Sequence, residues 1–268
     1  MNTMYAKMLT AMFNALLLLA LTLDAQTASR IVTVAHRGGI IPGVPENTLA
    51  AYRSAIACGV QAIEIDLRGT LDGGIVIMHD PTLDRTTNGK GTVSDHTLAE
   101  LKSLDAGMGE KIPEYEEVLR CVDGSGVVLL LDIKQSERLD VEKVLDLTAS
   151  FNATLKVIVG ARSVADVRLF KSLNPNIRVL AFMDSPAQID DFVQAGADII
   201  RLWPEWIEAK PELVGKVHAL GRPVWTTAGA ADAEALRALI DKGVNGILSD
   251  YPALLKELVT NNRCACNH

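Results

Sequence analysis

The feature that most constrains the fold is the alternation of short β-branched runs with longer helical stretches along most of the chain. Repeated strand–helix units predict a parallel sheet covered by helices. Nine candidate strands are present: Ile31–Ala35, Gln61–Leu67, Ile75–His79, Val127–Ile133, Lys156–Gly160, Ile177–Phe182, Asp198–Leu202, Pro223–Thr227 and Asn245–Ser249. Helical patterns separate most of them, for example Thr48–Cys58, Val141–Phe151, Ala231–Lys242 and Pro252–Val259. The sequence shows no long linker, so we expect one domain over residues 29–260.

One pair of these strands cannot be parallel neighbours. Only Arg68–Gly74 separates Gln61–Leu67 from Ile75–His79, which is too short for the crossover that parallel strands require. Its centre, Leu71-Asp72-Gly73-Gly74, favours a hairpin turn. We therefore expect Ile75–His79 to return antiparallel outside the main sheet, leaving eight parallel strands. The predicted fold class is α/β, a (β/α)8 TIM barrel with a small β-hairpin and helical insertion after strand 2.

The hairpin has a chemical consequence. With its turn centred near residues 72–73, Asp66 is predicted to face His79 across the ladder. His79 would then lie beside Glu64 and Asp66, at the strand ends where TIM barrels place their active sites.

Three acidic residues predict a metal site. Glu64 and Asp66 are two residues apart on one strand, so they share a face. Asp132 ends the next barrel strand, two residues before Lys134. Three neighbouring carboxylates suit one hard divalent cation, Ca²⁺ or Mg²⁺. The alternative is a set of salt bridges to Lys134 and Arg37.

The first strand ends in His36-Arg37-Gly38-Gly39. Arginine is suited to phosphate oxygens, and the two glycines free the backbone to approach a ligand. His36 and His79 would lie around one cation. This combination favours phosphodiester cleavage, in which one imidazole removes a proton from the attacking hydroxyl and the other protonates the leaving oxygen.

Several motifs follow one another in an order that resembles the glycerophosphodiester phosphodiesterase family. The main motifs are His36-Arg37, Glu46-Asn47-Thr48, Glu64-x-Asp66 and His79-Asp80. Supporting segments are Leu83–Thr87, Gly89–Val93, Leu101–Gly107, Ile112-Pro113, Leu131–Lys134, Val224–Thr226 and Gly243–Asp250. The resemblance spans about Val32 to Leu255.

The resemblance implies hydrolysis of a small-molecule glycerophosphodiester to glycerol 3-phosphate and an alcohol. It implies a TIM barrel in which His36 and His79 are the acid–base pair. The metal ligands it implies are Glu64, Asp66 and Asp132. The substrate or phosphate contacts it implies are Arg37, Lys134, Glu46, in support from the first loop, and Trp225.

One departure keeps alternatives open. The third metal ligand is usually glutamate in this family, whereas here it is Asp132, as in the related sphingomyelinase D toxins. A lyase that leaves a cyclic phosphate is therefore one alternative, and a non-catalytic phosphopolyol-binding protein is another. Trp203 and Trp206 follow the sixth barrel strand, where they either contact a choline group or pack the loop.

The N-terminus predicts export. Lys7 precedes the apolar run Met8–Leu23, and small residues follow. We interpret residues 1–28 as a signal peptide, with an uncleaved anchor as the alternative. The expected location is secreted or periplasmic, without stable membrane association after cleavage. Residues 261–268 are expected to form a polar tail. The net charge of −7 argues against nucleic-acid binding.

Overall fold

The computed structural model describes residues 31–134 and 138–265. The predicted signal peptide, residues 1–28, lies outside these residues, as does the end of the predicted tail, 266–268. The last helix, α11 (Pro252–Ala265), continues past Val259, where the sequence pattern predicted its end, so residues 261–265 of the predicted tail belong to this helix. No proline or glycine after Val259 ends the helix. Among the described residues, no helix combines the length and the apolar character needed to cross a membrane.

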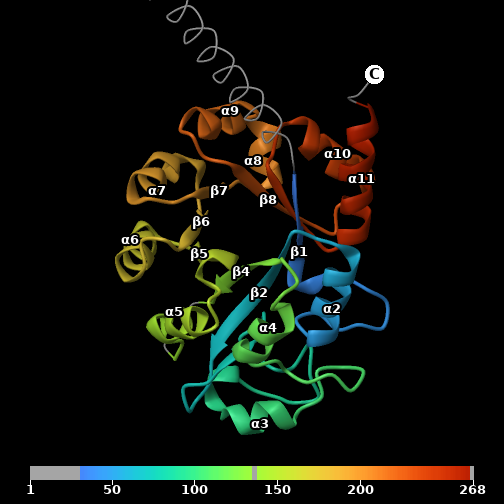
Figure 1. The fold of residues 1–268 in the computed structure, drawn as a ribbon, viewed down its shortest axis with the longest axis vertical. Helices are drawn as coiled ribbons and strands as arrows, with labels where there is room; N and C mark the ends of the chain where they lie inside the picture. The colour runs from blue at the N-terminus through green and yellow to red at the C-terminus, as the bar shows by residue number, and fades with distance from the viewer. Residues whose placement is uncertain (1–30, 135–137, 266–268) are drawn as a thin grey trace, which may run out of the picture. The chain divides into compact units, whose positions relative to one another are not determined.

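Eight parallel strands close into a barrel (Figure 1). The barrel closes where β1 (Val32–Ala35) pairs with both β2 (Ala62–Gly69) and β9 (Gly246–Ser249). The other barrel strands are β4 (Val128–Ile133), β5 (Val157–Ala161), β6 (Arg178–Phe182), β7 (Ile199–Arg201) and β8 (Val224–Gly229). The structure confirms the predicted (β/α)8 TIM barrel, and each predicted strand lies within about two residues of its observed bounds.

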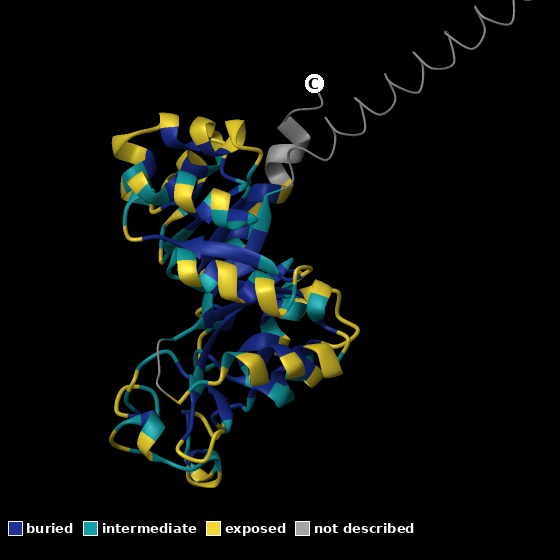
Figure 2. Cartoon of the chain, turned by 90° about the vertical axis from the view of Figure 1, so that its left-hand side faces the viewer, coloured by how far each residue is buried: buried dark blue, intermediate teal, exposed yellow. Residues whose placement is uncertain are grey.

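Helices cover the outside of the barrel, and their outward faces are exposed (Figure 2). Besides α11 they are α2 (Leu49–Cys58), α4 (Tyr115–Val122), α5 (Val141–Ser150), α6 (Val164–Leu173), α7 (Ile189–Ala195), α8 (Pro204–Ala209), α9 (Glu212–Ala219) and α10 (Ala233–Asp241). Several begin at a side-chain cap: Thr48, Asp140, Ser163 and Asp232 each accept a hydrogen bond from the first turn. Such caps satisfy amide groups that have no partner within the helix.

The barrel interior is filled by inward-pointing side chains. Its core consists of Val34, Ala62, Leu130, Ile158, Leu180, Phe182, Ile199, Trp225 and Leu248. Glycine is required beside the two largest rings, because a Cβ on Gly160 would overlap Phe182 and one on Gly246 would lie 2.6 Å from the indole nitrogen of Trp225. Since side chains alternate along a strand, the same inward rows continue to polar residues at the carboxyl ends: Glu64, Asp66, Asp132 and Arg201.

The predicted hairpin is confirmed, but its predicted register is wrong by one residue. β3 (Ile75–Ile77) runs antiparallel to β2, and Leu67 pairs with Ile77. The Met78 amide, not that of His79, therefore donates to the Asp66 carbonyl at 2.9 Å. The physical reason is the length of the turn. Three residues, 71–73, connect the strands, with Gly73 in the left-handed conformation (φ 77°), whereas a turn centred on residues 72–73 implied two.

The insertion after β2 has a small core of its own. It contains η2 (Val93–Asp95) and α3 (Leu98–Ser103). Its buried residues are Val76, Met78, Leu83, Val93, Leu101, Ala106 and Ile112. This packing holds the β3 segment, and with it the chain that leads to His79, in a fixed position.

Candidate active site

His36 lies immediately after β1, at the carboxyl end of the barrel. Its Nδ1 donates to Asp250 Oδ1 at 2.6 Å, and its Nε2 lies 4.0 Å from Glu64 Oε2. Burial lowers the pKa of His36, but the hydrogen bond to Asp250 and the charge of Glu64 outweigh it, so the net pKa is raised. A carboxylate at Nδ1 fixes the tautomer and leaves Nε2 facing the acidic residues.

Arg37 adopts a left-handed backbone conformation (φ 54°), which is uncommon for a residue with a side chain. This turn directs its amide to Glu64 Oε2 at 3.0 Å. Its guanidinium donates to Glu46 Oε1 at 3.1 Å, while its buried Nε has no hydrogen-bond partner among the described residues. Gly38 follows because a Cβ there would lie 2.6 Å from that of Ala51. Strained backbone of this kind is typical of functional sites.

The three predicted acidic residues come together. Glu64, Asp66 and Asp132 are buried, and one oxygen from each lies within 4.8 Å of the others. Asp66 and Asp132 are directly paired neighbours on β2 and β4. Burial and the charge of Asp66 raise the pKa of Glu64 to about 8. Three buried carboxylates repel one another, so the cluster requires positive charge nearby.

Part of that positive charge comes from Lys134, just after β4. Its Nζ lies 2.7 Å from Asp66 Oδ1 and 2.6 Å from Asp132 Oδ2. Asp66 Oδ1 nevertheless lacks a partner with hydrogen-bond geometry among the described residues. Asp66 Oδ2 accepts from the Asn47 amide at 2.7 Å, and Asn47 in turn accepts from Tyr52 at 2.9 Å. The predicted salt bridges and the predicted acidic cluster therefore coexist.

Asp132 has a second cationic partner that the sequence analysis did not identify. Arg162, just after β5, donates from Nη2 to both Asp132 oxygens, at 2.6 and 2.9 Å. Burial raises the pKa of Asp132, but Lys134 and Arg162 lower it more. Cations that follow β4 and β5 therefore hold the shorter Asp132 carboxylate.

The acidic cluster fits a hard divalent cation. All three donors are oxygens, as Ca²⁺ and Mg²⁺ prefer. Burial and the charge of Asp66 raise the pKa of Glu64, and Asp66 Oδ1 has no partner with hydrogen-bond geometry among the described residues, so both acidic groups can accept a further cation. Among the described residues, Glu64, Asp66 and Asp132 are the one group of at least three candidate ligand residues with this geometry.

His79 follows β3 and has a carboxylate partner of its own. Its Nδ1 donates to Asp80 Oδ1 at 2.7 Å. Arg68 of β2 fixes its backbone, since Nη2 donates to the His79 carbonyl at 2.5 Å and Nε to the Met78 carbonyl at 3.1 Å. Burial lowers the pKa of His79, although Asp80 and Asp66 oppose this.

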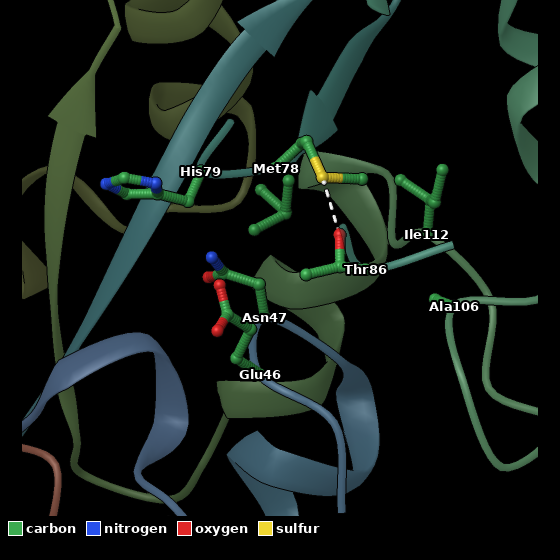
Figure 3. Close-up of a pocket in the computed structure, with 8 residues that line it drawn as sticks. Glu46, Asn47, Met78, His79, Thr86, Ala106 and Ile112 are labelled. Atoms are coloured by element: carbon green, nitrogen blue, oxygen red, sulfur yellow. Dashed lines mark hydrogen bonds between the residues drawn. The ribbon is translucent and has the colours of Figure 1, made fainter. Parts of the chain in front are cut away.

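A chain of ion pairs links the two histidine segments. Arg85 donates to Asp80 Oδ2 at 2.6 Å and to Glu46 Oε1 at 2.7 Å. Glu46 in turn accepts from Arg37. Figure 3 shows Glu46, Asn47 and His79 lining one small pocket, whose far side is apolar and whose Met78 sulfur accepts from Thr86. Glu46 is therefore placed to orient Arg37 and Arg85.

The structure brings eight of the nine predicted site residues together. Those eight are His36, Arg37, Glu46, Glu64, Asp66, His79, Asp132 and Lys134. Trp225 instead lies in the barrel core, 4% exposed, beside Gly246. Its contact with a substrate stays a prediction.

Several partners were not predicted as site residues, among them Asp250, Asp80, Arg68 and Arg162. Three of these four carry a signal that could have found them. Asp250 and Arg162 directly follow β9 and β5, as Lys134 follows β4, and Asp80 directly follows His79. Charged residues just after barrel strands point to the active-site face. Arg68 offered no such signal, because its role depends on the observed hairpin register.

Comparisons with known proteins agree with this geometry. The sequence model of the glycerophosphoryl diester phosphodiesterase family matches residues 36–254. A glycerophosphodiester phosphodiesterase of Caldanaerobacter subterraneus subsp. tengcongensis is 32% identical over 242 residues, which cover 86% of this chain and 98% of that protein. One from Bacillus subtilis is 31% identical over 85% of this chain and 86% of its own length.

Solved structures lead to the same group. A glycerophosphoryl diester phosphodiesterase from Parabacteroides distasonis superposes with a TM-score of 0.78 at 28% identity, covering 88% of each chain. An Oleispira antarctica phosphodiesterase, solved with the product sn-glycerol 3-phosphate, gives 0.74 at 26% identity and covers 85% of this chain and 96% of its own. With a matching fold, a matching family model and relatives above 30% identity, the chain belongs to the glycerophosphoryl diester phosphodiesterase family and is a glycerophosphodiester phosphodiesterase.

Proposed function

We propose that the protein hydrolyses glycerophosphodiesters to glycerol 3-phosphate and an alcohol, with His36 and His79 as its acid–base pair. One observation carries this proposal: each imidazole donates from Nδ1 to its own carboxylate, Asp250 or Asp80, beside one acidic cluster. Each Nε2 is then free to exchange a proton with a phosphodiester. The product complex of the Oleispira antarctica relative supports glycerol 3-phosphate as the product.

In this proposal the two histidines divide the proton transfers. One imidazole accepts the proton of the attacking hydroxyl, which is water or the 2-hydroxyl of the substrate. The other donates a proton to the oxygen of the departing alcohol. Where the 2-hydroxyl attacks, this step gives a cyclic phosphate, which water then opens to glycerol 3-phosphate. Asp250 and Asp80 hold the rings in place and stabilise each imidazolium as it forms.

Arg37 and Lys134 are proposed to bind the phosphoryl oxygens. The Lys134 ammonium lies at the cluster, and the Arg37 Nε is a buried donor without a hydrogen-bond partner among the described residues. In this proposal both charges would lie where negative charge develops on the phosphoryl group, and desolvation would strengthen their effect. Glu46 orients Arg37.

A divalent cation, Ca²⁺ or Mg²⁺, completes the proposed site. Glu64, Asp66 and Asp132 would hold it. When bound, it would act as a Lewis acid toward the phosphoryl oxygens. Because Asp132 is shorter than glutamate and shares both oxygens with Arg162, we propose that Glu64 and Asp66 contribute most of the binding energy.

The test uses purified protein with Ca²⁺ or Mg²⁺ and either glycerophosphocholine or glycerophosphoethanolamine. Release of glycerol 3-phosphate is expected, and no release with either substrate would contradict the proposal. Phosphorus NMR separates hydrolysis from the lyase alternative, since a lyase would accumulate a cyclic phosphate. Single His36→Ala and His79→Ala variants should abolish turnover while binding persists.

We also propose that residues 1–28 direct export of the protein. The support is the sequence pattern alone: a lysine, an apolar run and small residues. Cell fractionation of the full chain against a chain starting at Ser29 tests this. The full chain should leave the cytoplasm and the shortened chain should remain, and equal cytoplasmic retention would contradict export.

A further inference from the structure

Arg201 is a buried cation that the proposed mechanism does not use. It is the last residue of β7, only 5% exposed, and it continues the inward-facing row of the core residue Ile199. No carboxylate of the described residues lies within salt-bridge distance, and its Nε is buried without a hydrogen-bond partner in that same part of the chain. Charged groups are rarely buried unless they are paired, so this guanidinium needs a ligand.

Aromatic rings hold the guanidinium in place. Its Cζ lies 3.5 Å from the centre of the Trp203 ring and 4.9 Å from that of Phe182. Arg162 approaches the same Phe182 ring at 5.2 Å. Trp203 is 37% exposed, so the stack lies at the mouth of the barrel. Of the two interpretations of Trp203, packing is the one observed. A cationic choline group at this ring would be repelled by the Arg201 guanidinium, which already stacks on it.

Arg201 has oppositely charged neighbours only at longer range. Arg162 is engaged with Asp132, whereas Asp132, Asp184 and Glu205 act on Arg201 only through longer-range charge. Burial and Arg162 lower the pKa of Arg201 to about 10, so it stays charged at neutral pH.

Arg201 lies on the opposite arc of the barrel from the proposed catalytic groups. Those groups follow β1, β2, β3, β4 and β9, whereas Arg201 and Phe182 end the neighbouring strands β7 and β6. A phosphodiester held by the catalytic arc has two substituents, and in this proposal the substituent on the alcohol side would extend across the mouth toward β7. Arg201 would meet that substituent, not the phosphorus.

We propose that Arg201 binds an anionic group, a carboxylate or a phosphate, on the alcohol half of the substrate. The enzyme would then prefer glycerophosphodiesters whose alcohol carries a negative charge. This rests on the proposed function of the same site. The guanidinium fork matches both anions, and its desolvated charge without a salt-bridge partner would be compensated by them.

The test compares two substrates that differ by one carboxylate, glycerophosphoserine and glycerophosphoethanolamine. We expect kcat/KM of the wild type to favour glycerophosphoserine by roughly tenfold or more, the size of a buried charge-assisted hydrogen bond. Arg201→Gln should remove this preference by slowing only glycerophosphoserine, and Arg201→Lys should retain part of it. Deacylated cardiolipin, which carries a second phosphate, separates phosphate from carboxylate recognition.

Arg178→Gln is the matched control. Arg178 begins the neighbouring strand β6, at the opposite end of the barrel, where it donates to the Leu155 carbonyl. The substrate ratio should not change in this variant.

Several outcomes would overturn the inference. If the wild type has nearly equal kcat/KM for glycerophosphoserine and glycerophosphoethanolamine, the inference is wrong, even if Arg201→Gln fails to fold. Equal loss on both substrates would place Arg201 at the scissile phosphate. Calorimetric binding of both substrates to His79→Ala gives a readout without turnover. If wild type cleaves neither substrate, the proposed function fails, while a binding preference would still support the role of Arg201.

Discussion

At the scale of residues, carboxylate partners define the site as much as the histidines do. Both imidazoles are bonded at Nδ1, one to Asp250 and one to Asp80. Each partner fixes a tautomer and a ring orientation that a histidine side chain alone would not keep. The Asp250 contact spans most of the chain, because β9 closes the barrel against β1.

Asp250→Asn should therefore lower kcat by roughly 10²–10⁴-fold with little change in KM, since the ring loses its orienting carboxylate but the substrate contacts remain. Steady-state kinetics on glycerophosphoethanolamine measure both constants. Asp241→Asn, on the exposed end of α10, is the control and should behave as wild type. An unchanged kcat in Asp250→Asn would show that His36 does not depend on this contact.

At the scale of elements, the hairpin after β2 carries a histidine to the barrel mouth, and one side chain of β2 fixes its position. Arg68 donates to the carbonyls of Met78 and His79. The three-residue turn determines that Met78, just after β3, faces Asp66. Glycines play the corresponding role inside the barrel, where Gly160 leaves room for Phe182.

Arg68→Met should lower kcat by roughly tenfold while the protein stays folded, because the His79 backbone loses its anchor although the small core of the insertion remains. The measurements are kcat and the circular dichroism spectrum of Arg68→Met, each compared with the wild type. Arg120→Met, an exposed arginine of α4, serves as the control. A loss of folded structure as large as the loss of activity would argue against a positioning role.

Gly160→Ala should destabilise the fold by about 1–3 kcal/mol, since its Cβ would overlap Phe182 and approach the Leu131 carbonyl at 3.2 Å. Gly215→Ala, on the exposed face of α9 with no atom near its Cβ, should instead stabilise it by about 0.5–1 kcal/mol. Urea unfolding measures both changes. Equal effects of the two variants would contradict this packing argument.

At the scale of the whole molecule, the closed barrel concentrates charge at one end. The carboxyl ends of its strands bring together the acidic cluster, Lys134, Arg162 and Arg201. A cation held by the acidic cluster, whose members belong to β2 and β4, would stabilise the folded state relative to the unfolded chain.

Adding Ca²⁺ or Mg²⁺ to chelator-treated protein should therefore raise Tm, by roughly 5–10 °C when the ion is at about 100 times its Kd. Thermal unfolding measures the shift without any assay of activity. Asp66→Asn should show little or none of it. A similar shift in wild type and in Asp66→Asn would mean that the ion acts elsewhere.

The sequence by itself determined the fold and most of the site. Strand–helix alternation was enough to predict the barrel, and the short connection Arg68–Gly74 was enough to predict the hairpin. Both signals are local in the sequence. The alternation Glu64-x-Asp66 likewise fixed a shared face. The motif order predicted His36 and His79 as the acid–base pair and indicated the family of the chain.

Only the tertiary structure decided how those residues are partnered. Asp250 meets His36, and Arg162 meets Asp132, through strand pairings that sequence spacing does not encode. Met78, and not His79, lies opposite Asp66 because the hairpin turn is one residue longer than expected. Trp225 and Arg201 both face the barrel interior, and only the structure could decide this, because alternation along a strand fixes side-chain direction only once the strand's place in the barrel is known.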